Sequence, residues 1–249
     1  YIVQTIIARS LLGLKKNLNN LKKNQKVGLV PTMGCIHKGH LALVKKSKKL
    51  KYFTVVTIFV NPAQFNNKND LNKYPSQEKK DLEILKKNNV DLVFIPKLKQ
   101  VYPSGYSTYI KEINFSNILC GKHRKNHFSG VLTIVLKLFS IVLPKAAFFG
   151  EKDFQQLFLI KKMVTDLNLG VKIISIPTVR DANGLALSSR NKLLNVRSLE
   201  TAKKIFSKLK NISYLDYKRT KDLELYLKKE LKNSGFNNIE YLEVRESVS

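Results

Sequence analysis

The sequence predicts an α/β fold with a doubly wound parallel sheet, followed by a smaller α+β domain. Two observations support this prediction. Apolar runs rich in β-branched residues alternate with amphipathic helical patterns through about the first 180 residues, which is typical of repeated strand–helix units. After Asn191 the alternation ends, and two helical patterns precede one last apolar run. We therefore divide the chain into residues 1–179 and 180–249.

The strands are predicted from short apolar runs that end at turn residues. The longest, Phe53–Val60, is rich in β-branched and aromatic residues, as expected of a parallel strand buried on both faces. Asn61-Pro62 ends this run, and Pro96 and Pro177 end two later ones. The predicted strands cover residues 27–30, 53–60, 91–95, 146–149 and 171–176 in the first domain, and 239–244 in the second.

Helices are predicted between these strands. Apolar residues at Val131, Val135, Leu138 and Val142 indicate a long buried helix that ends at Pro144. The other predicted helices cover residues 41–50, 76–89, 154–169, 196–211 and 221–233, and a linker separates the last two. Residues 97–127 follow neither pattern and are expected to leave the core alternation.

Composition limits the class of protein. The net charge is +27, but lysine is spread along the whole chain together with asparagine, which favours solvated basic faces over a nucleic-acid surface. No apolar run is long enough to cross a bilayer, the N-terminus lacks a signal-peptide pattern, and Cys35 and Cys120 are the only cysteines. A protein of the reducing cytoplasm, with neither a membrane nor a nucleic-acid partner, is expected.

The segment Pro31–His40 carries the clearest functional signal. It joins a predicted strand to a helix start, where free backbone N–H groups and the helix dipole attract anions. His37 and His40 can point at one bound group, Gly39 allows close approach of the backbone, and Gly34 relaxes the turn. A nucleotide-phosphate site is the favoured interpretation. A lone histidine at a helix start could instead be a simple cap.

Three further polar clusters follow predicted strands, at the edge where parallel sheets bind ligands. They are Asn61–Phe65, Gly150–Asp153 and Leu187–Arg190. Each has an ordinary alternative: Gln64 could satisfy backbone groups, Gly-Glu-Lys-Asp could be a polar turn, and Ser188 could cap a helix. Neither a zinc-ligand spacing nor a Walker motif is present, so phosphate would be held by the helix start together with Lys152 and Arg190.

Taken together, these motifs resemble the pantothenate synthetase (pantoate–β-alanine ligase) family of the His-x-Gly-His nucleotidyltransferase superfamily. The matching segments are Pro31–Gly34 with His37–His40, Phe59–Phe65, Tyr74-Pro75, Val90–Phe94, His127-Phe128 with Gly130-Val131, Phe149–Gln156 and Gly184–Asn191. The resemblance runs from near residue 1 to the chain end. It implies a Rossmann-like first domain that binds ATP and pantoate, and a second domain that acts as a lid.

The resemblance also implies the reaction. Pantoate attacks the α-phosphate of ATP to give pantoyl adenylate and diphosphate, and β-alanine then displaces AMP to give pantothenate, with Mg²⁺ held by no dedicated protein cage. His40 is implied as proton donor, and the other implied catalytic residues are His37, Lys152, Ser188, Ser189 and Arg190. Gln64 and Gln156 are implied to bind pantoate, and Gln64 also β-alanine. The implied ATP-binding residues are Met33, Gly34, Cys35, Ile36, His37, Lys38, Gly39, His40, Gly150, Glu151, Lys152, Asp153, Val179, Leu187, Ser188, Ser189 and Arg190.

Two departures from the family pattern stand out. The loop Arg124–Gly130 lacks a proline and a second arginine that are usual there, although Arg124 and His127 match. Family members usually continue for a few more strands after the position of Ser249, and the first residue is Tyr1, so the sequence as given is expected to be incomplete at both ends. Family members are usually homodimers, which the resemblance carries over to this chain.

Two other functions remain open at this level. The same fold could serve a nucleotidyltransferase that adenylylates or cytidylylates a phosphorylated substrate. Alternatively, the excess of positive charge could mark a nucleic-acid-binding protein, although this would leave the set of motifs unexplained. The amides at Gln64 and Gln156 favour a small carboxylate as the acceptor.

Overall fold

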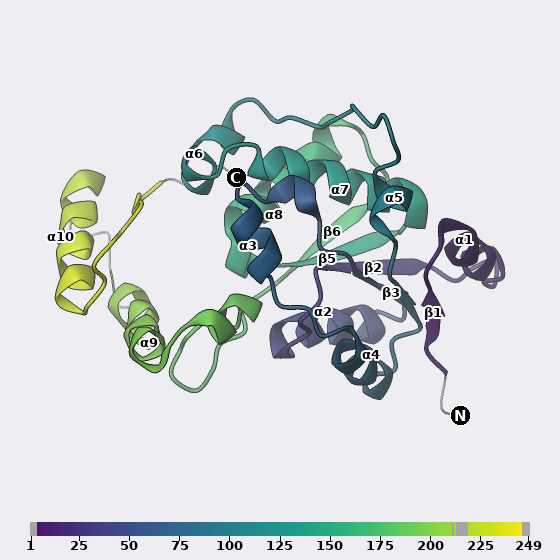
Figure 1. Ribbon diagram of the computed structural model, residues 1–249, viewed down its shortest axis with the longest axis horizontal. Helices are drawn as coiled ribbons and strands as arrows, with labels where there is room; N and C mark the ends of the chain where they lie inside the picture. The colour runs from purple at the N-terminus through teal and green to yellow at the C-terminus, as the bar shows by residue number, and fades with distance from the viewer. Residues whose placement is uncertain (1–3, 211, 213–218, 246–249) are drawn as a thin grey trace.

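A six-stranded parallel sheet with helices on both faces forms the body of the protein (Figure 1). The computed structural model describes residues 4–210, 212 and 219–245. The strand order is β1-β4-β3-β2-β5-β6. The strands are β1 (Ile6–Ala8), β2 (Val27–Thr32), β3 (Phe53–Ile58), β4 (Leu92–Phe94), β5 (Ala146–Gly150) and β6 (Lys172–Ile176). The predicted α/β doubly wound sheet is confirmed.

The helices follow the strands in alternation. The α-helices are α1 (Leu11–Asn19), α2 (Lys38–Lys49), α3 (Lys68–Lys73), α4 (Glu78–Lys87), α5 (Leu98–Val101), α6 (Cys120–His123), α7 (His127–Val142), α8 (Phe154–Asp166), α9 (Val196–Lys210) and α10 (Thr220–Asn233). Short 3₁₀ turns are η1 (Pro62–Gln64), η2 (Phe115–Asn117), η3 (Glu151–Asp153) and η4 (Ser189–Leu193). β1 and α1 were not predicted, and α2 begins three residues before its predicted start at residue 41.

Alternating side chains of the strands build two cores. On one face, Leu29 and Val55 pack with residues of α1, α7 and α8. On the other face, Val30 and Val56 pack with residues of α2 and α4. All six residues of β3 are buried, as its continuous apolar run predicted. Helices on both faces leave only the edges and ends of the sheet for a binding site.

The described part of the C-terminal region contributes two α-helices, α9 and α10. α9 and α10 lie to one side of the sheet, and the segment after α10 runs back towards α6 (Figure 1). The predicted strand at residues 239–244 is wrong: no strand is assigned there. A strand needs a backbone partner; here Val244 N instead donates to Glu224 Oε1 (2.7 Å), and Tyr241 stacks on His123. Residues 213–218 of the predicted linker lie outside the described residues, as does residue 211 at the end of the predicted helix 196–211.

Candidate active site

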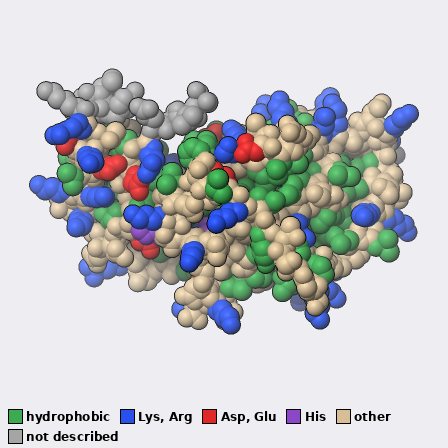
Figure 2. Space-filling model, turned by 90° about the horizontal axis from the view of Figure 1, so that it is seen from above, with side chains coloured by type: hydrophobic (Ala, Val, Ile, Leu, Met, Phe, Trp, Pro, Cys, Tyr) green, Lys and Arg blue, Asp and Glu red, His purple; other side chains and the backbone are tan. Residues whose placement is uncertain are grey.

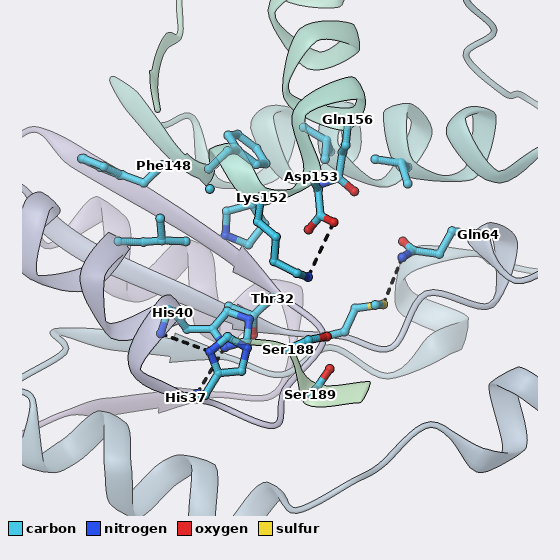
Figure 3. A pocket seen from close by; sticks show the side chains of 18 of the residues that line it. Thr32, His37, His40, Gln64, Phe148, Lys152, Asp153, Gln156, Ser188 and Ser189 are labelled. Atoms are coloured by element: carbon cyan, nitrogen blue, oxygen red, sulfur yellow. Dashed lines mark hydrogen bonds and ion pairs between the residues drawn. The ribbon is translucent and has the colours of Figure 1, made fainter. Parts of the chain in front are cut away.

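A cavity of about 260 Å³ opens at the carboxyl ends of the strands, between β2 and β5 (Figure 3). These neighbouring strands pair only at Gly28–Ala146 and Leu29–Ala147, whereas β2 pairs with β3 along its whole length. β2 and β5 therefore part towards their carboxyl ends. The chain also reverses its direction of winding between them, and such a switch point is where doubly wound sheets bind ligands.

The paired histidines stand at the start of α2. His37 Nδ1 accepts the backbone N–H of Gly39 (3.1 Å), and His40 Nδ1 accepts that of His37 (3.3 Å). A ring nitrogen that accepts a hydrogen bond carries no proton, so each neutral ring keeps its proton on Nε2. The ring centroids lie 4.0 Å apart, and both residues line the cavity (Figure 3). The histidines are thus caps and cavity residues at once, with Nε2–H left as the donor.

Burial keeps both rings uncharged. It lowers the pKa of His40 to about 3, and His37 and Lys152 act in the same direction. The pKa of His37 is lowered by burial and by Lys152 and Lys192. Gly39 allows this packing, because a Cβ there would lie 2.8 Å from Cε1 of the His37 ring. At neutral pH the site therefore offers two neutral N–H donors beside the cationic Lys152.

The loop before the histidines is held by a buried carboxylate. Asp81 of α4 is 1% exposed. Its Oδ2 accepts Cys35 N and its Oδ1 accepts Ile36 N, both at 2.8 Å. Gly34 (φ +84°) and Cys35 (φ +51°) have left-handed backbone, so the turn needs such an anchor. Burial and the nearby Asp81 raise the pKa of the Cys35 thiol, so this cysteine packs in the turn as a neutral thiol.

On the opposite wall, Gln64 is oriented by Asn61. Asn61 is 1% exposed, and its Nδ2 donates to Gln64 Oε1 (3.2 Å) and to Gly130 O (3.0 Å). Gln64 Nε2 points towards the cavity, 3.1 Å from Met33 Sδ (Figure 3). η1 approaches α7 so closely that a Cβ on Gly130 would lie 2.3 Å from Ala63 O. Gly130 thereby allows the contact that sets the position of Gln64.

Arg124 and His127 extend this wall. His127 Nδ1 lies 2.8 Å from Gln64 O and its Nε2 lies 3.2 Å from Arg124 Nη1. The arginine can only donate, so the histidine accepts on Nε2 and donates from Nδ1. Burial lowers the pKa of His127 to about 4, in agreement with a neutral ring. Despite its departures from the family pattern, the loop places both residues on the cavity.

The segment after β5 supplies a cation and an amide. Lys152 Nζ lies 3.6 Å from Asp153 Oδ1, and Lys152, Asp153 and Gln156 point into the cavity (Figure 3). The adjacent Gln155 has a different role: its amide accepts Cys120 N (3.1 Å) and donates to Phe115 O and Ile118 O (both 2.8 Å). Gln155 therefore anchors residues 115–120 to α8.

The segment at η4 closes the cavity and contacts the region of α3 and α4. Arg190 Nη2 lies 3.0 Å from Asp70 Oδ2, and Ser189 Oγ lies 3.1 Å from Tyr74 Oη. Ser188 caps η4, since its Oγ accepts Arg190 N at 3.2 Å. Ser188 thus is a cap, as its ordinary interpretation expected, and also lines the cavity with Ser189 and Arg190.

Most of the site residues implied by the resemblance meet in this one cavity. They are Met33, His37, Gly39, His40, Gln64, Gly150, Lys152, Asp153, Gln156, Val179, Leu187, Ser188, Ser189 and Arg190. Gly34, Cys35, Ile36, Lys38 and Glu151 do not line it. The backbone N–H groups of Cys35 and Ile36 are already bound by Asp81.

Sequence analysis missed the residues that support the site from a distance. Asp81 belongs to a segment interpreted only as a helix, and Asp70 to one that carried no prediction. One signal was present for Asp81: it lies four residues before Leu85, on the face of α4 that is buried. A carboxylate on an apolar helix face calls for hydrogen-bond donors from elsewhere.

The described residues offer neither a cluster of metal ligands nor a membrane-spanning helix. No group of three or more His, Cys, Asp or Glu side chains among them could hold a metal ion. None of the helices described is long and apolar enough to cross a membrane.

Comparison with known proteins identifies the family. The sequence model of the family described as pantoate-beta-alanine ligase matches residues 6–249. Pantothenate synthetase of Pseudothermotoga lettingae is 43% identical over 242 residues, covering 96% of this chain and 86% of the relative. That of Francisella tularensis subsp. novicida is 48% identical over 206 residues, covering 82% and 79%.

Similarity to solved structures supports the same family. The pantoate-beta-alanine ligase of Francisella tularensis, complexed with beta-gamma ATP and β-alanine, superposes with a TM-score of 0.84 at 43% identity, covering 93% of this chain and 86% of that one. Pantothenate synthetase of Thermus thermophilus gives 0.88 at 33% identity, covering 98% and 91%. With its two histidines, amides and cations gathered at the switch point of the sheet, the chain belongs to the pantoate–β-alanine ligase family.

Proposed function

We propose that this chain joins pantoate to β-alanine at the expense of ATP, through a pantoyl adenylate, and releases pantothenate, AMP and diphosphate. One observation carries the proposal most directly: two neutral histidine donors and Lys152 lie in the same cavity as the amides of Gln64 and Gln156. The first set suits a polyphosphate and the second a small hydroxy acid. The related Francisella ligase was solved with beta-gamma ATP and β-alanine, which supports both ligands.

In the first step, a carboxylate oxygen of pantoate attacks the α-phosphorus of ATP, and the bond to the bridging oxygen of diphosphate breaks. Negative charge grows on the phosphoryl oxygens in the transition state. The Nε2–H groups of His37 and His40 are the donors that we assign to these oxygens, with His40 as the proton donor. Because both donors are fixed by the backbone bonds at Nδ1, they need no reorganisation as the charge develops.

The phosphates leaving as diphosphate need cationic and hydroxyl partners. We assign Lys152, Ser188, Ser189 and Arg190 to this role. Arg190 is bound to Asp70, but the pair is exposed at the surface, with 41% and 40% of the two side chains accessible. Such a pair is worth less than about 1 kcal/mol, so a triphosphate can attract the guanidinium away.

Mg²⁺ fits this site only together with the nucleotide. Asp153 is the single carboxylate among the described residues that line the cavity. Mg²⁺ binds through one or two carboxylates and substrate phosphates, so Asp153 would be its protein contact. When bound, the ion would neutralise charge on the leaving diphosphate.

In the second step, the amine of β-alanine attacks the acyl carbon of the adenylate, and the bond to the AMP oxygen breaks. The amine proton leaves to solvent or to the phosphate of AMP. Gln64 is positioned to contact both acids in turn, since its Nε2 faces the cavity. No side chain needs to form a covalent bond in either step.

A substrate panel tests the reaction. The purified chain should release AMP from MgATP only when pantoate and β-alanine are both present, and pantothenate should appear in equal amount. His40→Ala should lower the rate by about 10²–10⁴-fold. His123→Ala is the matched control, because His123 lies outside the cavity. An unchanged rate in His40→Ala would overturn its assignment, and turnover of a phosphorylated acceptor instead of pantoate would favour a nucleotidyltransferase.

We further propose that the chain acts in the cytoplasm as a homodimer without a nucleic-acid or membrane partner, and that residues 1–179 and 180–249 form its catalytic domain and its lid. Lysine and arginine side chains are scattered over the face shown in Figure 2 and do not form one stripe, which supports solvated basic faces. Light scattering of the purified protein tests the dimer. Salt-sensitive binding to DNA or RNA at physiological ionic strength would contradict the absence of a nucleic-acid partner.

A further inference from the structure

A tyrosine outside the residues assigned above bonds to the wall of the cavity. Tyr102 directly follows α5 and is half-buried. Its Oη donates to Asn61 Oδ1 at 2.9 Å. Burial raises the pKa of this hydroxyl, so it remains a donor at neutral pH. Tyr102 does not line the cavity, and any effect that it has on substrate must pass through Asn61.

Asn61 uses its whole amide in this network. Its Oδ1 accepts Tyr102 Oη and, at the longer distance of 3.3 Å, Ala63 N. Its Nδ2 donates to Gln64 Oε1 and Gly130 O. Because Asn61 is buried, an unfilled acceptor site on Oδ1 cannot be filled by bulk water. The tyrosine therefore supplies the shorter of the two bonds that hold the asparagine oxygen in place.

The orientation passes from Asn61 to Gln64. Asn61 Nδ2 donates a hydrogen bond to Gln64 Oε1. The other end of the glutamine amide, the Nε2–H₂ group, is thereby directed to the cavity. A donor at this position favours a carboxylate or hydroxyl ligand, whereas a turned amide would present an acceptor and repel a carboxylate.

Tyr102 is itself held in place by its neighbours. Its ring lies 5.0 Å from the Tyr106 ring in an edge-to-face arrangement, 6.3 Å from the Phe59 ring, and 5.6 Å from Lys137 Nζ. These contacts involve the ring alone. Removing only the hydroxyl should therefore leave the ring packed as before and change only the bond to Asn61.

We propose that Tyr102 is a positioning residue for the carboxylate substrate: through Asn61, it keeps the Nε2–H₂ group of Gln64 directed at the acid that is activated. This inference rests on the proposed function for the identity of that acid. It assigns Tyr102 an effect on the acids that Gln64 contacts and none on ATP, because the histidines, Lys152 and η4, which we assign to ATP, make no bond in this network.

Tyr102→Phe tests the proposal, with Tyr106→Phe as its matched control. Tyr106 belongs to the same aromatic cluster, but its hydroxyl has no hydrogen-bond partner among the described residues. In Tyr102→Phe, the KM for pantoate should rise about tenfold, which corresponds to the loss of roughly one hydrogen bond, while the KM for ATP stays near that of the parent. The melting temperature should fall by only a few degrees, because Asn61 Oδ1 keeps the bond from Ala63 N. Tyr106→Phe should leave both KM values unchanged.

A purely structural role would lower the melting temperature or kcat and leave the KM for pantoate unchanged, and this result would overturn the proposal. A parent protein without pantoate-dependent AMP release would overturn the proposed function instead. The network can also be tested without substrate, from the side-chain amide resonances of ¹⁵N-labelled protein. Tyr102→Phe should shift the signals of both Asn61 and Gln64, and an unmoved Gln64 signal would overturn the relay.

Discussion

The contact between α7 and η1 gives the most quantitative prediction. A Cβ at Gly130 would lie 2.3 Å from Ala63 O, 2.4 Å from Ala63 C and 2.7 Å from Gln64 N. Ordinary Cβ contacts begin at 3.4 Å, so Gly130→Ala falls about 1.1 Å short of the room it needs. All three obstructing atoms are backbone, and no rotamer change can relieve the overlap. Either η1 or α7 must move, and Gln64 moves with η1.

Two opposing effects set the size of the stability change. Within a helix, alanine is favoured over glycine by about 1 kcal/mol, whereas overpacking of this kind costs about 1–3 kcal/mol. The steric term wins, and we expect a net loss of up to about 2 kcal/mol in the free energy of unfolding. Activity should suffer more, because a displacement of about 1 Å at a substrate-binding group can lower the rate about 100-fold.

Urea denaturation and steady-state AMP release measure the two effects. Gly170→Ala is the control, because a Cβ there meets nothing within 4 Å. We expect Gly170→Ala to match the parent protein in both assays. A Gly130→Ala enzyme with kcat/KM for pantoate within twofold of the parent would refute the argument that this close approach positions Gln64.

Two further predictions concern buried polar groups. In the folded protein the pKa of His127 is lowered to about 4, whereas in the unfolded chain the ring takes up a proton near pH 6.5. Between these two pH values the unfolded state binds more protons than the folded state. The free energy of unfolding should therefore fall as the pH decreases from about 6.5 towards 4. Urea denaturation at pH 7 and pH 5 should show a smaller decrease for His127→Gln than for the parent, and an equal decrease would contradict the assignment. Asp81→Asn should lower the free energy of unfolding by about 1–3 kcal/mol, because the amide has one oxygen for the two backbone N–H groups that Asp81 binds. It should also raise the KM for ATP. Calorimetry and steady-state kinetics measure the two effects, and a variant that matches the parent in both would contradict the prediction.

The sequence predicted the fold where its pattern was local. Alternating runs and helical periods placed β2 to β6, α2, α4 and α7 to α10 within a few residues, because burial on one or two faces dictates such patterns. The three-residue strand β1 was too short to carry a period. The predicted strand at 239–244 was wrong for the opposite reason: its apolar pattern is clear, but a strand exists only when another strand lies beside it.

For the candidate site, too, the sequence predicted some features, and others depend on the tertiary structure. The sequence by itself determined that His40, Gln64, Lys152 and Ser188 gather in one cavity, since each follows a parallel strand and such strands share one edge. Only the tertiary structure decided what holds them in place. Asp81 binds a loop 45 and 46 residues away, and Tyr102 reaches Asn61 across 41. Hydrogen bonds between distant side chains depend on the packing of whole elements, which leaves no period or spacing in the chain.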